Sequence, residues 1–465
     1  MPVVTACRKR LGKTAAAAVA LLIVTTVATA GAQTRLTADE VAHRAVATSA
    51  TLAARRADVD AAAAAVSEAR ATLLPRVVGT ARYARLSPIT APSVGNIVVT
   101  PDPGEISQQN FPVSVAVRFP VLLDQYVLQA GASVPLSDYL LRFPHTTTAA
   151  AEGASAARAN QRAAAARIAG DARALYYEWA RARLQRDVAV SAREQTRAHL
   201  EYVKSRRDAG GSTVADVLRV ESQLAAADLL ALRTENLAGL LEDQLRTVLH
   251  DPGKQPYTVG DDLDAATPAA PTSGDAATSR ALEERAELAA LAHMSAVDRA
   301  LGHATRALVL PRLELYGGIL SANPNPRFFP QQDRFHTTWE AGVSLTFSPN
   351  DVVAGLAVAR RQRARAAATD AERQTLAEAI RAEVLAAARA QQESAGAMAT
   401  TARGLAAAEE SYRVRRALFT EGRATSVELT DAETDLVRAR LAAIDARIDA
   451  GLARVRLQKA GGESP

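Results

Sequence analysis

Two acidic residues near the carboxyl end have the spacing of groups that could act together. Glu428 and Asp431 lie three positions apart, just after the turn-like stretch TEGRATS. In a helix this spacing places both side chains on one face. Asp216 takes the position of Glu428 in a similar stretch earlier in the chain, where Arg219 replaces the second acid. Paired carboxylates of this kind attract cations when they line a narrow path, or they are ordinary solvated surface acids.

The sequence contains no pattern that is typical of an enzyme. Its seven His are scattered, without an HExxH motif or another paired metal-ligand spacing. Neither a phosphate-binding loop nor a nucleophile elbow is present. The single cysteine, Cys7, cannot form an internal disulfide. We therefore predict a protein that is not an enzyme and that has no cofactor or metal, and we expect its histidines to be solvated.

Residues 1–32 have the three parts of a secretory signal peptide. A basic cluster precedes the apolar run AAAAVALLIV, and the small residues AGA precede Gln33. The run is too short for a permanent anchor, although an uncleaved anchor is the alternative. This segment holds Cys7 and four basic residues, so most of the net charge of +5 belongs to it. The remaining chain has neither the basic-aromatic pattern of nucleic-acid binding nor an apolar run of about 20 residues for a membrane helix.

The chain that follows reads as two copies of one unit. Leu-Pro-Arg at residues 74–76 recurs at residues 310–312, and DAGGSTVADVL is matched by TEGRATSVELT. Residues 33–250 and 280–465 each contain a helix, a strand, a loop, a strand, a very long helix, a turn and a helix. The first unit has the longer loop between its strands, residues 87–125, and residues 251–279 form a turn-rich linker.

Two helical segments are too long for a compact domain. Between residues 139 and 207 the only proline is Pro144, and between 352 and 420 there is none. A helix of about 68 residues is roughly 100 Å long. Such helices need coiled-coil partners, and a plain structural coiled coil is the alternative interpretation of these segments alone.

Shorter segments alternate apolar and polar residues, as RVVGTARY, RLELYGGIL and TTWEAGVSLTF show. This alternation is typical of a transmembrane β-barrel and also of a half-buried strand in a soluble sheet. Four strands cannot close a barrel, and lipid does not tolerate an open edge, so strands from other copies would be required. Pro75 and Pro311 are expected at the junctions from helix to strand, because proline ends a helix sharply.

These features together resemble the TolC-type outer-membrane efflux proteins of Gram-negative bacteria. The segment from LTADEVAHRAV to ATLLPRV looks like the first helix of that family, and the two glycine turns look like its hairpin tips. The resemblance implies a mainly α fold with a membrane β-barrel: a homotrimer with a twelve-stranded barrel in outer-membrane lipid and a twelve-helix tube in the periplasm. Residues 251–279 would belong to an equatorial belt. A periplasmic adaptor (membrane fusion) protein and an inner-membrane pump would be the partners, and the channel itself would be passive.

The resemblance also assigns roles to residues at the tips. Glu428 and Asp431 match the paired acids of the family's periplasmic gate, and a trimer would place six such carboxylates around the axis. Ala424 stands where the best-known member has a gate-locking arginine, so that lock is absent or is supplied by neighbouring Arg423. Arg219 would link to an acid of a neighbouring hairpin or lie on the surface. The positions for adaptor docking, for which helix capping by the glycines is the simpler reading, are Asp208, Gly210, Gly211, Glu421 and Gly422.

The sequence thus predicts an exit duct for tripartite efflux or type I secretion in the cell outer membrane. The alternative is a periplasmic coiled-coil adaptor or structural protein. An adaptor would have one hairpin with Gly-rich β-domains on either side, whereas this chain has two hairpins. Neither the exported substrate nor the class of pump follows from the sequence.

Overall fold

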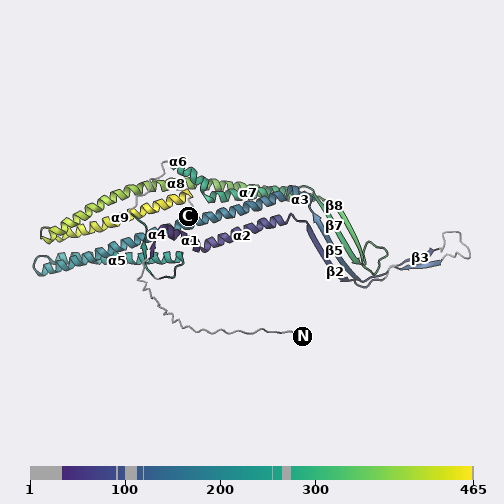
Figure 1. Ribbon diagram of the computed structural model, residues 1–465, viewed down its shortest axis with the longest axis horizontal. Coiled ribbons are helices and arrows are strands. Elements are labelled where there is room, and N and C mark those ends of the chain that lie inside the picture. Colours follow the sequence, from purple (N-terminus) through teal and green to yellow (C-terminus); the bar gives the residue numbers. More distant parts are fainter. Residues whose placement is uncertain are drawn as a thin grey trace, which may run out of the picture.

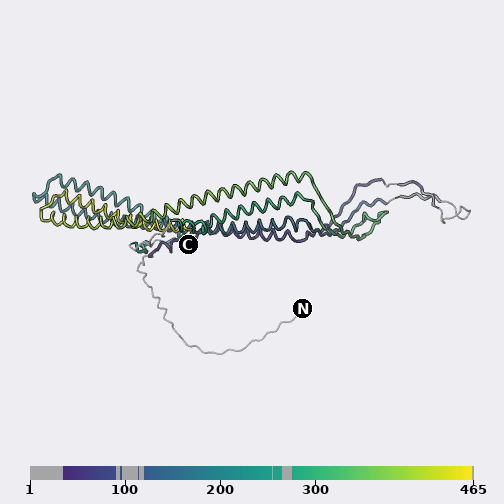
Figure 2. Tube along the Cα trace, turned by 90° about the horizontal axis from the view of Figure 1, so that it is seen from above, coloured from purple at the N-terminus to yellow at the C-terminus, as the bar shows by residue number. Residues whose placement is uncertain are grey.

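The computed structural model describes residues 34–90, 93–99, 113–118, 120–253, 255–263 and 274–462. The predicted signal peptide therefore lies outside the described residues. The molecule is elongated, with helices over most of its length and the longer strands at one end (Figures 1 and 2). In chain order its elements are β1 (Thr34–Leu36), α1 (Ala38–Thr48), α2 (Ala50–Ala71), β2 (Arg76–Arg85), β3 (Ser93–Val99), β4 (Val113–Arg118), β5 (Asp124–Val134), α3 (Leu136–Leu141), α4 (Phe143–Asp208), α5 (Val214–Leu249), β6 (Tyr257–Val259), α6 (Gly274–Glu284), α7 (Ala286–Ala307), β7 (Arg312–Asn323), β8 (His336–Thr346), α8 (Pro349–Thr420) and α9 (Ser426–Gly461).

Two helices, α4 and α8, run through the whole helical part. They contain 66 and 72 residues, which corresponds to about 100 and 110 Å at 1.5 Å per residue. The shorter helices pack beside them, α2 and α7 in the half nearer the strands and α5 and α9 in the other half (Figure 1). The prediction of long helical hairpins in a duplicated, mainly α chain is confirmed.

Small side chains allow these helices to lie close together. Most of the buried residues of α4 are alanines, which leave little distance between neighbouring backbones. The largest core lies near the middle of the molecule, where α1, α4, α5 and α9 meet around the fully buried Tyr176 and Trp179. Gly451 of α9 lies against the Tyr177 ring, and a methyl group at this position would overlap the ring.

The segment expected to be a turn-rich linker, residues 251–279, contains regular structure as well. Its strand β6 pairs in parallel with β1, and α6 begins at Gly274. Tyr257 in β6 is buried edge-on against Trp179, and its hydroxyl donates to Asp251. Burial, with the Asp251 carboxylate beside the ring hydroxyl, raises the pKa of Tyr257 to about 12. The linker is therefore anchored to the central core by an aromatic side chain.

Four of the eight described strands form an antiparallel sheet in the order β2-β5-β7-β8. The adjoining helices α2, α4, α7 and α8 are neighbours in the same order. Register brings Val77, Ala132, Gly317 and Ala341 opposite one another across all four strands. Residues opposite each other share a face, so the apolar faces predicted for the separate strands form one continuous surface.

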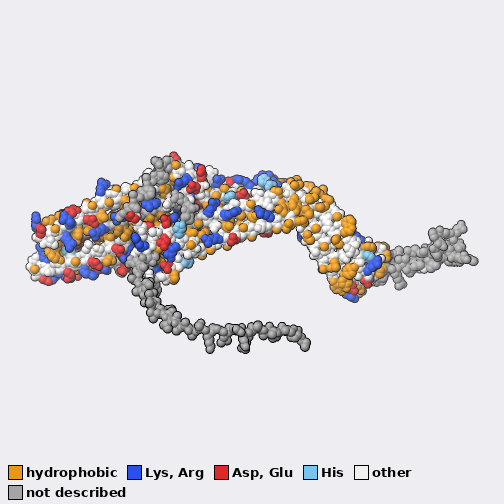
Figure 3. All heavy atoms as spheres, in the orientation of Figure 1, with side chains coloured by type: hydrophobic (Ala, Val, Ile, Leu, Met, Phe, Trp, Pro, Cys, Tyr) orange, Lys and Arg blue, Asp and Glu red, His pale blue; other side chains and the backbone are white. Residues whose placement is uncertain are grey.

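That apolar surface is not covered by any other part of the described chain. Trp339 is 74% exposed and Leu345 is 70% exposed. Hydrophobic side chains gather over the sheet, whereas charged side chains are spread over the helical part (Figure 3). The opposite face of the sheet is polar and is hollowed around Arg76, Gln129 and Glu340. A surface so large and so apolar indicates contact with lipid or with another protein.

The loop expected at residues 87–125 contains a second small sheet. Strands β3 and β4 pair antiparallel beyond the ends of β2 and β5, with an irregularity between Ser93 and Asn96. Gly95, at φ +86°, occupies this irregularity, as glycine commonly does in a β-bulge. The Pro- and Gly-rich composition concealed the two β-branched runs, SVGNIVV and VSVAVR, that form the hairpin.

None of the helices described is long and apolar enough to cross a membrane.

The close approach of α9 to α4 predicts that Gly451→Ala destabilises the protein. Overpacking of this kind costs about 1–3 kcal/mol, because the Tyr177 ring has to move. The measurement is thermal unfolding of the purified protein. Gly404→Ala in α8, where an added Cβ has no neighbour within 4 Å, is the control and should leave the unfolding temperature unchanged or higher. Equal effects of the two substitutions would contradict the packing argument.

Candidate functional site

The turns between α4 and α5 and between α8 and α9 lie at the same end of the molecule, opposite the sheet (Figure 1). Gly210 and Gly422 adopt φ +79° and +75°, a left-handed conformation that favours glycine. The following amides of Gly211 and Arg423 each donate to the carbonyl five residues earlier, at 2.8 Å. Both turns are therefore Schellman motifs, in which the glycine ends the helix and satisfies its last carbonyls.

The helices that leave the two turns begin with the same reciprocal cap. Thr425 Oγ1 accepts from Glu428 N at 3.3 Å, and Thr425 N donates to the Glu428 carboxylate at 2.9 Å. Thr213 and Asp216 form the matching capping box at the first tip, at 3.2 and 2.9 Å. Glu428 also accepts from Arg415 at 2.7 Å. The Thr425 backbone bond, supported by Arg415, lowers the pKa of Glu428, and the Thr213 bonds lower that of Asp216.

The other residues predicted at the gate present their side chains outward. Asp431 is exposed one turn after Glu428, and its carboxylate makes no hydrogen bond or ion pair with any residue described. Arg219 is exposed as well. Arg423 has only a loose pairing with Glu421, at 3.6 Å. The structure thus separates the two acids that the sequence paired: Glu428 caps its own helix, while Asp431 is available for another partner.

A compact apolar cluster joins the two hairpins behind these turns. Its buried members are Leu200, Val203, Val217, Val220, Phe419 and Leu429, with Ala424 packed against them. Arg206 of α4 donates to the Phe419 carbonyl at 3.2 Å, and its guanidinium lies over the Phe419 ring. Among the docking positions, Asp208 pairs with the adjacent Arg207 at 2.6 Å. The cluster makes the two tips of one chain a single unit.

A buried ionisable pair next to this cluster was missed by the sequence analysis. His199 of α4 lies 3.1 Å through Nδ1 from Glu433 of α9, and both side chains are almost fully buried. The expectation that the histidines are solvated is wrong here. Its other ring nitrogen, Nε2, is buried without a hydrogen-bond partner among the residues described. The two residues are 234 positions apart, so no local pattern indicated their contact.

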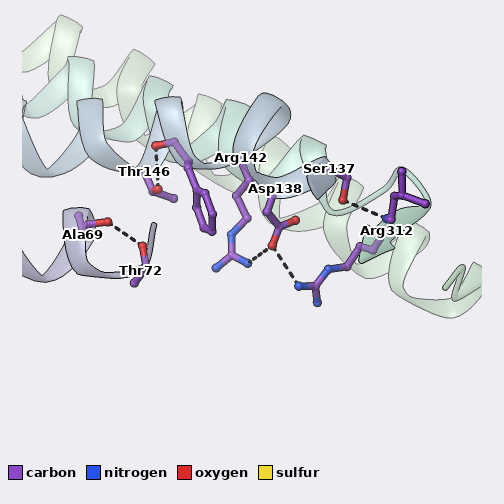
Figure 4. Close-up of polar contacts among 9 residues, drawn as sticks. Ala69, Thr72, Ser137, Asp138, Arg142, Thr146 and Arg312 are labelled. Atoms are coloured by element: carbon purple, nitrogen blue, oxygen red, sulfur yellow. Dashed lines mark hydrogen bonds and ion pairs between the residues drawn. The ribbon is translucent and has the colours of Figure 1, made fainter. Parts of the chain in front are cut away.

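The junctions between helices and strands contain a second buried acid. Pro75 and Pro311 immediately precede β2 and β7. Asp138 in α3, only 5% exposed, accepts from Arg312 at 3.0 Å and pairs with Arg142 at 3.4 Å (Figure 4). Beside it, Leu313 N donates to Ser137 Oγ at 3.2 Å. These bonds connect the start of β7 in the second repeat to α3, the short helix that follows β5 in the first repeat.

This architecture is similar to that of known proteins. The sequence profile of the family described as outer membrane efflux protein matches residues 41–249 and 277–463, one segment in each repeat. A solved structure of the outer-membrane channel OprN has a TM-score of 0.74 at 19% identity, covering 91% of this chain and 89% of that one. No curated protein matches the chain.

Two further solved structures have the same fold. The CmeC outer membrane channel of Campylobacter jejuni has a TM-score of 0.71 at 14% identity, with 91% of this chain and 85% of that one covered. The open state of the MtrE outer membrane channel of Neisseria gonorrhoeae has a TM-score of 0.67 at 18% identity, with 91% and 88% covered.

The capping boxes predict an acid-dependent loosening of the tips. Because the folded-state pKa values of Asp216 and Glu428 lie below the ordinary values of 3.8 and 4.5, their contribution is complete above about pH 4.5 and is lost as the pH falls through the lowered values. Hydrogen-exchange protection of residues 213–217 and 425–429 should decrease in that range.

Glu428→Gln is the matched control for this loss. Glutamine at the third helical position retains the reciprocal cap but does not titrate. The variant should therefore lose the acid sensitivity at residues 425–429 and keep it at residues 213–217. The same acid sensitivity at both tips of the variant would rule out Glu428 as the group responsible.

Proposed function

The chain belongs to the outer membrane efflux protein family, and from this premise we propose that it is a homotrimeric channel that forms the exit duct of a tripartite efflux or type I secretion machine. The observation that carries the proposal is the four-stranded sheet with one continuous apolar face and two open edges. In lipid such edges have to be paired, and copies of the same sheet supply the partners.

Three copies fit a duct better than two. Two sheets would give eight strands, and barrels of that size have an interior that side chains fill. Three sheets give twelve strands and leave a lumen, which the polar, hollowed face with Arg76, Gln129 and Glu340 would line. The four neighbouring helices α2, α4, α7 and α8 of each chain would likewise give twelve helices around the tube. Outer-membrane lipid would contact the face that contains Trp339 and Leu345.

The helical part would cross the periplasm and meet the other components at its tips. Its long helices extend about 100 Å away from the sheet. Periplasmic adaptor tips would dock around the two Schellman turns, where Asp208, Gly210, Gly211, Glu421 and Gly422 lie at the extremity of the molecule. Conduction would be passive and non-enzymatic, with an inner-membrane pump supplying the energy. A periplasmic adaptor, the competing class, gives no account of the exposed apolar sheet.

At the periplasmic gate Asp431 would be the main charge. Its exposed carboxylate has no partner among the residues described, whereas Glu428 and Asp216 are occupied by capping. Three copies of Asp431 near the axis would favour cations and bind a divalent ion. Arg423 and Arg219, both exposed on the tips, would provide contacts between neighbouring hairpins.

Membrane fractionation and reconstitution test the proposed function. The protein should remain in the sarkosyl-insoluble outer-membrane fraction, and purified protein should form ion-conducting pores in planar bilayers. Both outcomes follow from an apolar sheet that closes only in lipid. Recovery of the protein wholly in the soluble periplasmic fraction would support the adaptor class instead.

Substitution of Asp431 tests the gate. Asp431→Asn should weaken block of the pore by divalent cations about tenfold or more, which corresponds to ~1.4 kcal/mol, because the charge is removed while the size is kept. Asp435→Asn is the control, since Asp435 is one turn farther along the same helix and pairs with Arg438. Equal block in the native channel and in Asp431→Asn would exclude Asp431 from the gate.

A further inference from the structure

The contact between the two repeats within this chain is a template for the contact between two copies of the chain. Within the chain, β5 of the first repeat pairs with β7 of the second. Strand β7 corresponds to β2, because both follow Leu-Pro-Arg, and β5 corresponds to β8, because LQAGAS in β5 matches WEAGVS in β8. The two outer strands β2 and β8 are therefore equivalent to the two inner strands that already pair.

Three of the four groups of the internal contact have an aligned counterpart at the outer edges of the sheet, and Pro349 stands in the place of the fourth, Asp138. Inside the chain, Ser137 accepts from the Leu313 amide, and Asp138 pairs with Arg312. At the edges the corresponding serine is Ser348, which precedes α8, and the corresponding amide belongs to Val77. Arg76 corresponds to Arg312, and Asp351 is the acid in the first turn of α8.

The side chains of Ser348, Arg76 and Asp351 have no hydrogen-bond or ion-pair partner among the residues that the structure describes. Ser348 is at the N-cap position of α8, but its side chain makes no capping hydrogen bond. The side chains of Arg76 and Asp351 make no hydrogen bond or ion pair with any residue that the structure describes, and both are exposed. Their charges are opposite, so the two edges of the sheet complement each other.

We propose that the seam, the line along which two copies of the sheet meet, has the same strand pairing as the contact between the two repeats of one chain. In this seam β8 of one copy pairs antiparallel with β2 of the next copy, in the register of β5 with β7. In this register Ser348 accepts from the Val77 amide of the next copy, and Asp351 pairs with Arg76 of that copy. Asp351 is two residues farther from its serine than Asp138 is, a difference that the long arginine side chain spans. The inference rests on the proposed trimer and specifies how its sheets join.

The register follows from the internal pairs. Val134 lies opposite Leu315, and Ala132 lies opposite Gly317. Their counterparts place Leu345 opposite Gly79, and Val343 opposite Ala81. All of these residues belong to the apolar surface, so the seam continues that surface around the barrel. A slip of one residue would turn apolar side chains of one copy toward the polar face of the next.

Disulfide cross-linking tests the register, since the only cysteine lies in the predicted signal peptide. The matched variant is Gly79→Cys with Leu345→Cys, and an added Cβ at Gly79 meets nothing within 4 Å. Within one chain these positions lie on opposite edges of the sheet, and Gly79 is level with Trp339 rather than with Leu345. They are therefore roughly 25 Å apart, which is too far for a disulfide. The control, Gly79→Cys with Ala341→Cys, displaces one thiol by about 13 Å along the strand.

After oxidation, the matched variant should run as a reducible covalent trimer on denaturing gels, and the control should remain monomeric. Cross-linking of the control, or no cross-linking of the matched variant in a protein that is trimeric by mass in detergent, would overturn the register and leave the proposed function standing. A monomeric mass in detergent would overturn the proposed function as well.

Charge exchange tests the ion pair separately. Arg76→Glu should reduce the fraction of trimer that survives mild denaturation, and adding Asp351→Arg to the same chain should restore it, because the pair is then reversed. Arg82→Glu, on the same strand but away from Asp351, should not be restored by Asp351→Arg. Failure of the restoration would remove the ion pair from the seam.

Discussion

The need to pair the backbone hydrogen-bonding groups along β2 and β8 governs the rest of this structure. In lipid no water is present to satisfy an open strand edge, and each unpaired amide or carbonyl costs several kcal/mol. A sheet with one apolar face and two such edges is therefore incomplete as a single chain. The proposed completion of the sheet by further copies would account for both the apolar outer surface and the polar, hollowed inner one.

The strand order also determines the order of the helices. Helices α2, α4, α7 and α8 lie side by side in the same order as the strands that they adjoin. The junctions preserve that order, because Pro75 and Pro311 limit each turn to a few residues, and the buried Asp138 holds the start of β7 against α3. The barrel and the tube are thus two parts of one continuous arrangement rather than separate domains joined by linkers.

At the opposite end, the same residue types serve both structure and the proposed gating. The glycines and the acids at the start of α5 and α9 end one helix and begin the next, through Schellman turns and capping boxes. The Phe419 cluster and the His199–Glu433 pair then hold the two hairpins together. Any opening of the tube at this end has to move both tips of a chain as one unit or break these buried contacts.

The sequence by itself determined the duplication, the long helices, the strands with their apolar faces and the positions of the tips. These features depend on local periodicity and on turn residues, which a single segment contains. The T-x-x-E spacing at Thr425 also indicates the capping role of Glu428, although the spacing of Glu428 and Asp431 suggested a gate instead. Only the tertiary structure decided the strand order, the β1–β6 and β3–β4 pairs, and the contacts of Asp138 with Arg312 and of His199 with Glu433. Those contacts join residues 174 and 234 positions apart, and packing of the whole chain brings them together where no local pattern can.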